Sequence, residues 1–482
     1  MNWSSISRNV GIALILSAAF MFISAAVSVF YNFDASFGPL FLSGMITMAV
    51  GSFPLIFVRK SRGMTLKEGY VTIVLTWFLS CIVGMIPYVI YGGEFSVINA
   101  WYESVSGYTT TGSSILNDIE ALPRGLLFWR ASTHYIGGLG VVVFMLLILP
   151  STRTGSGVKI SKVEISTFSK ENYKFKLTET AKIIIAVYLS ITILLTISLR
   201  LTGIGLFDSL ANSMSIAATG GFSTHSLSAA HFNNPVAEVV MIIFMYIASL
   251  HFGVLYTSVI SGSLKLFRNP VVKFYTFVLI FAIIISTAAL LIDGREQNFF
   301  TALRHSAFMN VSTASSTGFA TTQTKSWPVI SLLILFFFSF MGACSGSTTG
   351  GIKADRMLLW FSSLKGIIRR KLHSNAVVRP RIGNRIVDND TIIDVSQFIL
   401  LFFSIIFIGA IALSSIGMDI EDSLTTSIAC VGNTGLTFGS GGAFGSYSDF
   451  PAIGKVIMTI EMFFGRLEIY PILAFALANR WK

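Results

Sequence analysis

The chain has 482 residues, of which 53% are hydrophobic and only 12% are charged, and its formal net charge is +11. Soluble domains carry about 25% charged residues, so this composition excludes a chain folded as several water-soluble domains. Apolar runs of about 20 residues, each long enough to cross a bilayer as a helix, indicate an all-α polytopic membrane protein.

Ten long apolar spans follow one another along the chain. They cover 10–32, 38–58, 70–92, 126–150, 181–203, 236–262, 272–292, 328–360, 394–417 and 452–479. The first run is longer than the core of a signal peptide and a second span follows it at once, so we interpret it as an uncleaved helix. Cys81, Cys344 and Cys430 lack the spacing of a metal site, and we expect them to be small buried side chains.

Basic residues gather in four connecting segments, at 59–67, 151–182, 263–273 and 353–385, whereas the segments between them lean acidic. If both termini are cytoplasmic, every basic segment lies on the cytoplasmic side, as the positive-inside rule requires. Topology therefore accounts for most of the excess positive charge. We expect contact with membrane lipid and no nucleic-acid partner.

Four segments on the opposite side share one pattern: a half-length apolar piece, a Thr-Gly step and a short polar return. They read "INAWYESVSGYTTTGSS", "LFDSLANSMSIAATGGFST", "FFTALRHSAFMNVSTASSTGFATT" and "DIEDSLTTSIACVGNTGLTFG". A piece of 10–14 apolar-leaning residues is typical of a re-entrant helix rather than of a span. The shared steps are Thr111-Gly112, Thr219-Gly220, Thr317-Gly318 and Thr434-Gly435.

The repetition predicts two N-terminal helices followed by four pseudo-fourfold repeats of helix, pore helix, filter loop and helix around one pore. The expected units are an N-terminal two-helix unit at 1–62 and pore repeats at 63–155, 156–265, 266–372 and 373–482. A monovalent cation that enters a membrane must exchange its water oxygens for others, and rings of backbone carbonyls from four loops supply them in potassium channels. Glycine reaches the backbone conformations that such a loop needs, and half-helices can aim their negative C-terminal ends at the ion.

The last span of the third repeat contains "GACSGSTTGG", and a continuous helix should not carry so many glycines. We expect a broken helix whose loop lies across the pore below the filter, the alternative being close helix packing through small residues. Arg466 and Glu468 lie inside the last apolar run, where ionisable residues are costly. Our hypothesis is that Arg466 projects toward the pore, to repel cations or to hydrogen-bond the glycine-rich loop; the alternative is an ion pair with no role in transport. We expect Glu468 to pair with Arg466, and Arg130 to reach outward toward water. We interpret the glycines at 137–140 as a site of close packing and His251 as a satisfied interior histidine.

The motifs "YTTTGSS", "ATGGFSTH", "SSTGFATT", "GNTGLTFG", "GACSGSTTGG", "FWRASTHYIGGLG" and "FGRLEIYP" together resemble the Trk/Ktr/HKT superfamily of potassium transporters, and most closely its TrkH-type pore subunits. The resemblance covers nearly the whole chain. It implies potassium uptake through a channel-like pore in the bacterial cytoplasmic (inner) membrane, driven by the membrane potential. It also implies a homodimer, and gating by a cytosolic tetrameric regulatory subunit that binds ATP, ADP or NADH. Potassium is then the transported ion, the chain binds no organic cofactor, and it is not an enzyme.

By position, the resemblance assigns a filter and a gate. The filter residues are Thr110, Thr111 and Gly112; Ala218, Thr219 and Gly220; Ser316, Thr317 and Gly318; and Asn433, Thr434 and Gly435. The gating residues are Gly342, Gly346, Ser347, Thr348, Thr349, Gly350, Gly351 and Arg466. A glycine rather than a serine at 112 favours potassium over sodium within this superfamily. The regulator is expected to dock on the basic segments 151–182 and 353–385, whose other interpretation is topological retention and lipid contact.

Two other functions stay open. A sodium- or proton-coupled potassium symporter on the same scaffold needs a carboxylate near the ion path, and Glu468 is the one clear candidate in the sequence. A membrane enzyme needs a cluster of acidic, histidine or cysteine side chains at one interface, which the six scattered histidines do not favour.

Overall fold

The computed structural model describes residues 1–59, 65–148, 177–262, 265–372, 380–383, 385–436, 438 and 442–477. Within these ranges nearly all regular structure is helical. The exceptions are the two-residue strands β1 (Arg381–Ile382) and β2 (Arg385–Ile386), which pair antiparallel. The prediction of an all-α polytopic membrane protein is confirmed.

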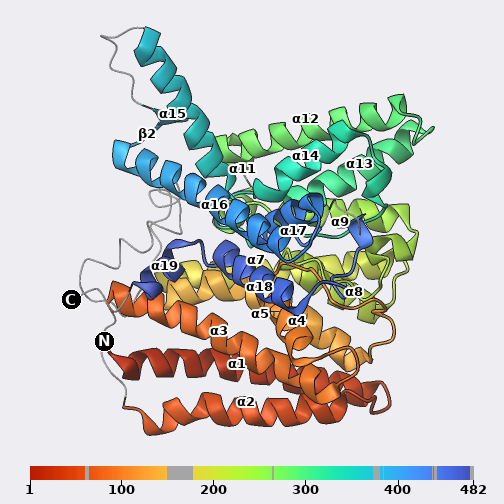
Figure 1. The fold of residues 1–482 in the computed structure, drawn as a ribbon, viewed down its shortest axis with the longest axis vertical. Helices are drawn as coiled ribbons and strands as arrows, with labels where there is room; N and C mark the ends of the chain where they lie inside the picture. The colour runs from red at the N-terminus through yellow and green to blue at the C-terminus, as the bar shows by residue number, and fades with distance from the viewer. Residues whose placement is uncertain are drawn as a thin grey trace.

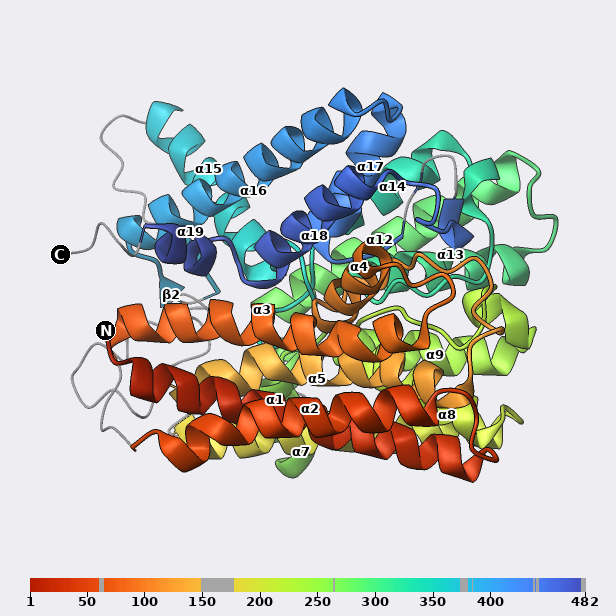
Figure 2. The same ribbon diagram turned by 60° about the horizontal axis from the view of Figure 1, so that its bottom comes forward.

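The first two helices, α1 (Trp3–Phe30) and α2 (Phe37–Phe57), form a hairpin along one edge of the molecule (Figures 1 and 2). Glycines let them approach closely: a Cβ on Gly11 would lie 2.5 Å from the carbonyl oxygen of Gly51. Small residues at a helix contact are the usual means of packing in lipid. The link between the two helices is tied to the first unit that follows, because the Asp34 carboxylate accepts a hydrogen bond from Gly125 N at 3.1 Å.

Four units of similar plan follow the hairpin, each with an incoming helix, a half-helix, a loop and an outgoing helix. The incoming helices are α3 (Leu66–Tyr91), α7 (Leu177–Leu201), α12 (Pro270–Ile292) and α16 (Asn389–Ser415). The half-helices are α4 (Val97–Tyr108), α8 (Leu206–Ala217), α13 (Phe299–Ala314) and α17 (Ile420–Gly432). The outgoing helices are α5 (Arg124–Ile148), α9 (Pro235–Ala248) with α10 (Phe252–Ile260), α14 (Val329–Phe340) with α15 (Ala354–Leu372), and α18 (Ala452–Arg466) with α19 (Tyr470–Ala476). Short connecting pieces are α11 (Lys265–Arg268), η2 (Ser228–Phe232), η3 (Thr324–Ser326) and η4 (Gly442–Phe444).

The half-helices are buried over their C-terminal halves. Their last two turns are enclosed although they carry many serines and threonines, for example Ser104 and Ser106 in α4 or Ser312 and Thr313 in α13. All four begin near the surface, and two of them begin at a side-chain cap: the Ser96 hydroxyl accepts from Asn99 N, and the Asn298 side chain accepts from Phe300 N. Polar half-helices therefore run from the surface to the centre of the molecule.

Three of the outgoing helices are interrupted. The expected span 236–262 is two helices bent by 103° at Ser249–His251, and the span 452–479 breaks at Leu467–Ile469, so the prediction of continuous helices there is wrong. The predicted break in 328–360 is confirmed, since α14 ends at Phe340 and α15 begins at Ala354. Among the described residues, six single helices are long and apolar enough to span a membrane, or seven if the bent pair counts as one span.

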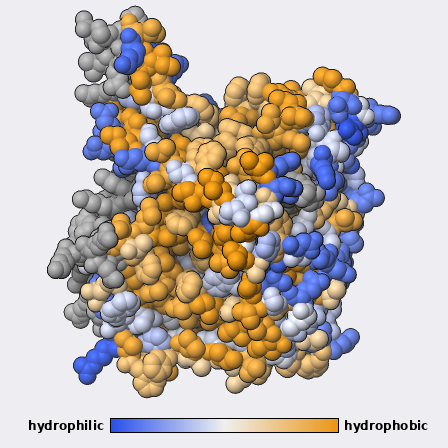
Figure 3. All heavy atoms as spheres, viewed as in Figure 1, coloured by the Kyte–Doolittle hydropathy of each residue, from blue (hydrophilic) through white to orange (hydrophobic). Residues whose placement is uncertain are grey.

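The two ends of the molecule differ. A cavity whose lining includes Met1, Lys67 and Ala474 places the starts of α1 and α3 beside α19 at one end, which we call the terminal end (Figure 2). The half-helices begin at the opposite end. The face shown in Figure 3 is broadly apolar across its middle and becomes hydrophilic toward that opposite end, as a membrane-embedded surface should. The predicted boundaries between residues 62 and 63 and between residues 155 and 156 lie outside the described residues, and so does residue 373 at the boundary of the third and fourth repeats. The boundary between residues 265 and 266 stays a prediction.

Candidate ion-conduction site

Four short loops follow the half-helices and close into a ring at the centre of the molecule. Each loop ends in a glycine with positive φ that touches the next loop. A Cβ on Gly112 would lie 2.1 Å from Gly220 O, one on Gly221 2.5 Å from Thr317 O, one on Gly318 2.6 Å from Thr434 O, and one on Gly435 2.1 Å from Thr111 O. The contacts run from the first loop to the fourth and back to the first. No side chain beyond hydrogen fits at these four positions.

The backbone also fixes which residues are equivalent. The first residue of each loop has a positive φ of 53°, 54°, 49° and 52°, at Thr110, Thr219, Ser316 and Asn433. The amide of each donates to the carbonyl three residues earlier, at 3.0, 3.0, 2.9 and 3.2 Å. The equivalent triplets are therefore Thr110-Thr111-Gly112, Thr219-Gly220-Gly221, Ser316-Thr317-Gly318 and Asn433-Thr434-Gly435.

The sequence register of the second loop is off by one residue. The predicted triplet Ala218-Thr219-Gly220 matches the letters Thr-Gly, but Ala218 still has helical backbone, with φ of −77°, like Thr109 in the first loop. Gly221, which lies outside the predicted triplet, is the residue equivalent to Gly112. The spacing from the half-helix holds the missed signal: Ser106, Ser215, Ser312 and Ala429 each precede the positive-φ glycine by six residues.

The carbonyl oxygens of the four triplets are the chemically distinctive feature of the ring. Within the described part of the chain, none of them accepts a hydrogen bond, although the first two residues of every triplet are buried. Buried carbonyls are nearly always paired, because an unpaired one loses its water without compensation. The hydroxyls of Thr110 and Thr434 are likewise buried without a hydrogen-bond partner among the described residues. The ring thus presents oxygen acceptors that the protein itself does not satisfy.

Side chains from the half-helices hold the loops in this shape. The Ser106 hydroxyl donates to Ser113 O at 2.6 Å, and Ser312 repeats the contact with Phe319 O at 2.6 Å. In the second unit this supporting contact comes from His134 of helix α5: its Nδ1 lies 3.0 Å from Ser215 Oγ, and its ring stacks on Phe222. Gly137, which lies in α5 as His134 does, packs against the end of α4, since a Cβ there would lie 2.0 Å from Tyr108 O. The expectation that this glycine serves close packing is confirmed.

Arg130 supports the ring from behind and does not reach outward, so that prediction is wrong. It is 1% exposed, and its Nε lies 2.8 Å from the buried Glu103 carboxylate. Its other nitrogens donate to Ser223 O and Ser114 Oγ, both at 3.2 Å. The pair links the half-helix and return loop of the first unit to the return loop of the second. Glu103 was not recognised from the sequence because its partner lies 27 residues away.

The segment between α14 and α15 lies directly against the ring. It folds back on itself, since Ile352 N donates to Phe340 O at 2.8 Å and a Cβ on Gly342 would lie 1.9 Å from Gly350 O. Its tip touches three of the loops. Thr348 Oγ1 donates to Ala217 O at 3.1 Å, Gly350 N donates to Ser316 Oγ at 2.9 Å, and a Cβ on Gly350 would meet Gly432 O. We call residues 341–353 the crossing loop.

Arg466 fastens the crossing loop in place. Its two terminal nitrogens donate to Thr348 O at 2.7 Å and to Gly137 O at 3.1 Å, so it bridges the loop and helix α5. The expectation of a hydrogen bond between Arg466 and this loop agrees with the structure. The expected pairing of Arg466 with Glu468 is wrong, because Glu468 bonds Arg356 at 2.5 Å. Residues 467–469 turn the chain there, with positive φ at Glu468 and Ile469, and this turn separates the two side chains.

Comparisons with known proteins agree with this architecture. The TrkH family, described as a cation transport protein, matches residues 39–480. The chain belongs to the TrkH family. Curated relatives are named Trk system potassium uptake proteins. TrkH of Escherichia coli is 29% identical over the whole of both chains, and TrkG of the same organism is 32% identical over 95% of this chain and 94% of its own. The fold also matches the crystal structure of the potassium transporter TrkH from Vibrio parahaemolyticus, with a TM-score of 0.90 and 27% identity over all of both chains.

These relatives are transporters, which agrees with the interpretation that this chain is not an enzyme. The three cysteines are free and buried, as expected. His251 caps α10 through its Nδ1, which accepts from Gly253 N at 3.0 Å, so its interpretation as a satisfied interior histidine agrees with the structure.

Proposed function

We propose that this chain carries potassium into the cell through a channel-like pore that passes along the axis of the four-loop ring. The observation that supports this most directly is the ring of buried carbonyl oxygens that accept no hydrogen bond within the described residues. Such oxygens can replace the hydration shell of a permeating cation. The C-terminal ends of the four half-helices add partial negative charge at the same place. The names of the curated relatives, Trk system potassium uptake proteins, point to the same ion.

The crossing loop is our candidate for the gate. It lies on the side of the ring where the half-helices end, and it touches the second, third and fourth loops through Thr348 and Gly350. Influx needs no chemical fuel when the membrane is negative inside, since one charge gains about 2.3 kcal/mol per 100 mV. Control then consists of moving the crossing loop and releasing Arg466 from Thr348 O.

Helix α15 supplies a mechanical connection from the gate to the protein's surroundings. It continues directly from the crossing loop and projects from the body of the molecule (Figure 1). We place the terminal end in the cytoplasm of a bacterium, on the charge distribution of the connecting segments. A cytosolic tetrameric regulator that binds ATP, ADP or NADH would reach α15 and the basic segment 353–385 there; most of the other basic segment, 151–182, lies outside the described residues.

The same helix is a candidate contact for a homodimer. Its exposed face carries Phe361, Leu364, Ile367, Ile368 and Leu372, the last of which is 72% exposed. An apolar stripe on a helix that stands away from the body fits a partner surface better than water. Cross-linking of single cysteines placed along this stripe in native membranes tests the dimer: cross-links between copies are expected along one face of α15 only.

A co-ion-coupled symporter is the second candidate, and one buried carboxylate favours it. Glu461 in α18 is 3% exposed, one of its oxygens accepts from Ser427 Oγ, and the other has no hydrogen-bond partner among the described residues. A carboxylate held this way could take up a proton or a second cation. The sequence candidate Glu468 does not serve, because it is bonded to Arg356.

Growth rescue of a potassium-uptake-deficient bacterium at low potassium tests the proposed function. The parent chain is expected to rescue, and Gly112→Ser, Gly221→Ser, Gly318→Ser and Gly435→Ser are expected to lose rescue or potassium preference. Gly38→Ser is the matched control, because no atom lies within 4 Å of a Cβ at that position. Rescue by all four variants as well as by the parent would remove the ring as the ion path. Reversal potentials of the purified protein in bilayers then distinguish a channel from a symporter. The reversal potential of a channel follows the potassium gradient alone, and Glu461→Gln leaves that reversal potential unchanged.

A further inference from the structure

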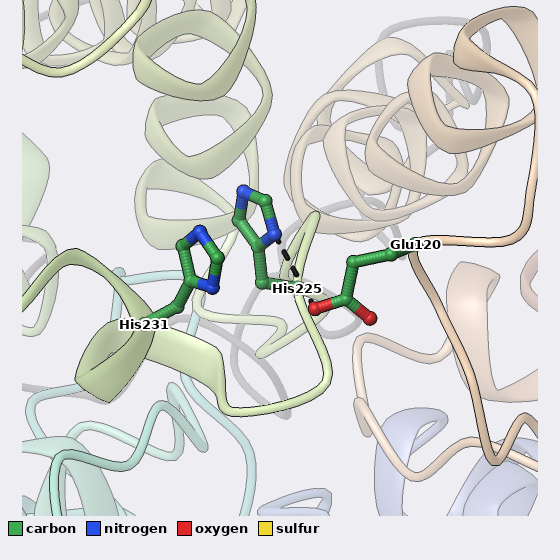
Figure 4. Close-up of side chains that lie close together, drawn as sticks. All are labelled: Glu120, His225 and His231. Atoms are coloured by element: carbon green, nitrogen blue, oxygen red, sulfur yellow. Dashed lines mark ion pairs between the residues drawn. The ribbon is translucent and has the colours of Figure 1, made fainter.

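A group of metal-type ligands lies beside the ring, at the end where the half-helices begin. Glu120, His225 and His231 each offer one ligand atom, and these atoms all lie within 4.8 Å of one another. Figure 4 shows the three side chains converging from the segments that follow the first and second filter loops. Among the residues that the structure describes, this is the one group of three or more such ligands. Nothing in the sequence analysis singled it out.

The donor set is one that zinc favours. Two imidazoles and one carboxylate form a common three-ligand zinc site, in which water takes the fourth position. Donor atoms on a tetrahedral zinc lie roughly 3.3 Å apart, since each is about 2.0 Å from the metal. His231 is exposed, but its ring stacks on that of His225 with the centroids 3.5 Å apart, so zinc binding requires the His231 side chain to rotate out of this stacked position. Calcium and magnesium prefer all-oxygen sites, so this set discriminates against them.

The surroundings of His225 are those of a prepared ligand. Its Nδ1 is buried and makes no hydrogen bond among the described residues, although it lies within ion-pair distance of Glu120 Oε1, at 3.4 Å. Its Nε2 faces Asp208 Oδ1 at 3.6 Å. Histidines that bind metals usually turn their second nitrogen to a carboxylate, which fixes the ring and the tautomer.

Glu120 is held in the same way. Its carboxylate accepts hydrogen bonds from Ser226 N at 3.0 Å and from the Ser226 hydroxyl at 2.5 Å, and these bonds attach it to the second return loop. Ligating carboxylates usually carry such supporting bonds. Asp208, which faces His225, also lies 3.6 Å from the Arg124 guanidinium and offsets its charge.

We propose that Glu120, His225 and His231 bind a zinc ion on the external face, and that this ion slows potassium influx. The site joins the first return loop to the second, and His225 follows Gly221 by only four residues. A divalent cation at this point stiffens two of the four loops and repels arriving monovalent cations. The effect on influx rests on the proposed function, but the binding of zinc does not.

Zinc binding is measured first, without reference to transport. Tag-free full-length protein in detergent is titrated with zinc chloride by calorimetry, and X-ray absorption at the zinc edge identifies the bound ligands. The parent is expected to bind one zinc ion through two imidazole nitrogens. His231→Ala and Glu120→Gln should each weaken that binding by about 10- to 100-fold. Equal affinity in the parent and both variants overturns the site.

A matched control is present at the same end of the molecule. His305 Nδ1 lies 2.9 Å from Glu296 Oε1, but among the residues that the structure describes no third metal-type ligand joins this pair, so His305→Ala should bind zinc as the parent does. His231 and Glu120 are exposed, which keeps the risk of misfolding low.

Transport is measured next. Potassium uptake into proteoliposomes is expected to fall when zinc is added outside the parent and to stay unchanged for His231→Ala. If the rate of potassium uptake by the parent is the same with and without zinc bound at these residues, the proposed effect on influx is overturned. Absence of any potassium uptake without zinc would instead count against the proposed function and leave the binding result intact.

Discussion

Arg466 is the residue at which the proposed gate can be tested most directly. Its guanidinium group donates to Thr348 O at 2.7 Å and to Gly137 O at 3.1 Å, and so holds the crossing loop against the body of the protein. Arg466→Ala removes both bonds and a positive charge beneath the ring. We expect potassium flux in the absence of any regulator to rise.

The structure sets the size of the expected effect. A hydrogen bond from a charged donor contributes about 1.5–3 kcal/mol, so two contribute roughly 3–6 kcal/mol to the closed arrangement. Water that enters the vacated space satisfies part of that loss, and we take about 2 kcal/mol as the lower bound of the shift. Because about 1.4 kcal/mol is a factor of ten in an equilibrium, flux should rise at least tenfold unless the parent is already mostly open. Arg466→Lys keeps the charge but cannot span both carbonyls, and its flux should fall between the two.

The assay is potassium-selective current or tracer uptake in proteoliposomes that contain the pore chain alone. Arg8→Ala is the matched control, because Arg8 also donates to two carbonyls, Leu55 O at 2.9 Å and Val58 O at 2.6 Å, but in the N-terminal hairpin. Its flux should equal that of the parent. A well-folded Arg466→Ala protein with parental or lower flux would refute the assignment of this arginine to the gate.

Three further predictions concern the ring and its supports. Gly221→Ala should abolish potassium preference. Gly220→Ala should also be defective, but for another reason: its new Cβ would lie 2.3 Å from His134 Nδ1. Adding His134→Ala should therefore restore uptake to the Gly220→Ala variant and not to the Gly221→Ala variant in the same uptake assay. Arg130→Met should lower stability by about 3–5 kcal/mol in detergent unfolding, because it leaves the Glu103 charge buried, and the double variant with Glu103→Gln should lose less than the sum of the single losses. Burial alone would raise the pKa of Asp34, but hydrogen bonds from Ser28, Ser36 and Gly125 outweigh it and lower the pKa below the usual 3.8. This carboxylate therefore stabilises the fold above about pH 4 and loses the contribution as the pH falls further, so the melting temperature of the parent should drop more steeply below pH 4 than that of Asp34→Asn.

The sequence predicted the repeats because their main determinants are local. A half-length apolar piece that ends in a positive-φ residue and a glycine is encoded within about 20 residues, and three of the four predicted triplets coincide with the loop residues that are equivalent in backbone conformation. The second loop contains two adjacent glycines, Gly220 and Gly221. The match to the Thr-Gly pattern selected Gly220, whereas the residue equivalent to Gly112 in backbone conformation is Gly221. The backbone decides between them, because the end of α8 fixes where the loop starts.

The breaks in the outgoing helices show what local sequence does not contain. No proline interrupts 236–262, yet the chain bends by 103° between α9 and α10. The crossing loop, about 95 residues further on, supplies the missing partners: Cys344 N donates to Ser249 O at 3.2 Å, and Phe252 N donates to Gly346 O at 3.1 Å. A helix can open where another segment satisfies its freed backbone groups, and only the tertiary fold reveals that segment.

The crossing loop also explains why four repeats on one chain differ from four identical subunits. The loop packs under the ring through contacts that exist once each: Thr348 with the second unit, Gly350 with the third and fourth, and Arg466 from the last. Four copies related by exact symmetry would place four such loops at one axis, where there is space for one. The first residue of the triplet differs among the units accordingly: it is threonine in the first two, serine in the third and Asn433 in the fourth. The side-chain amide of Asn433 donates to Thr111 Oγ1 at 2.9 Å and to Met462 O at 3.2 Å. Fusion of the repeats into one chain thus permits a single, asymmetric crossing loop beneath a nearly symmetric ring.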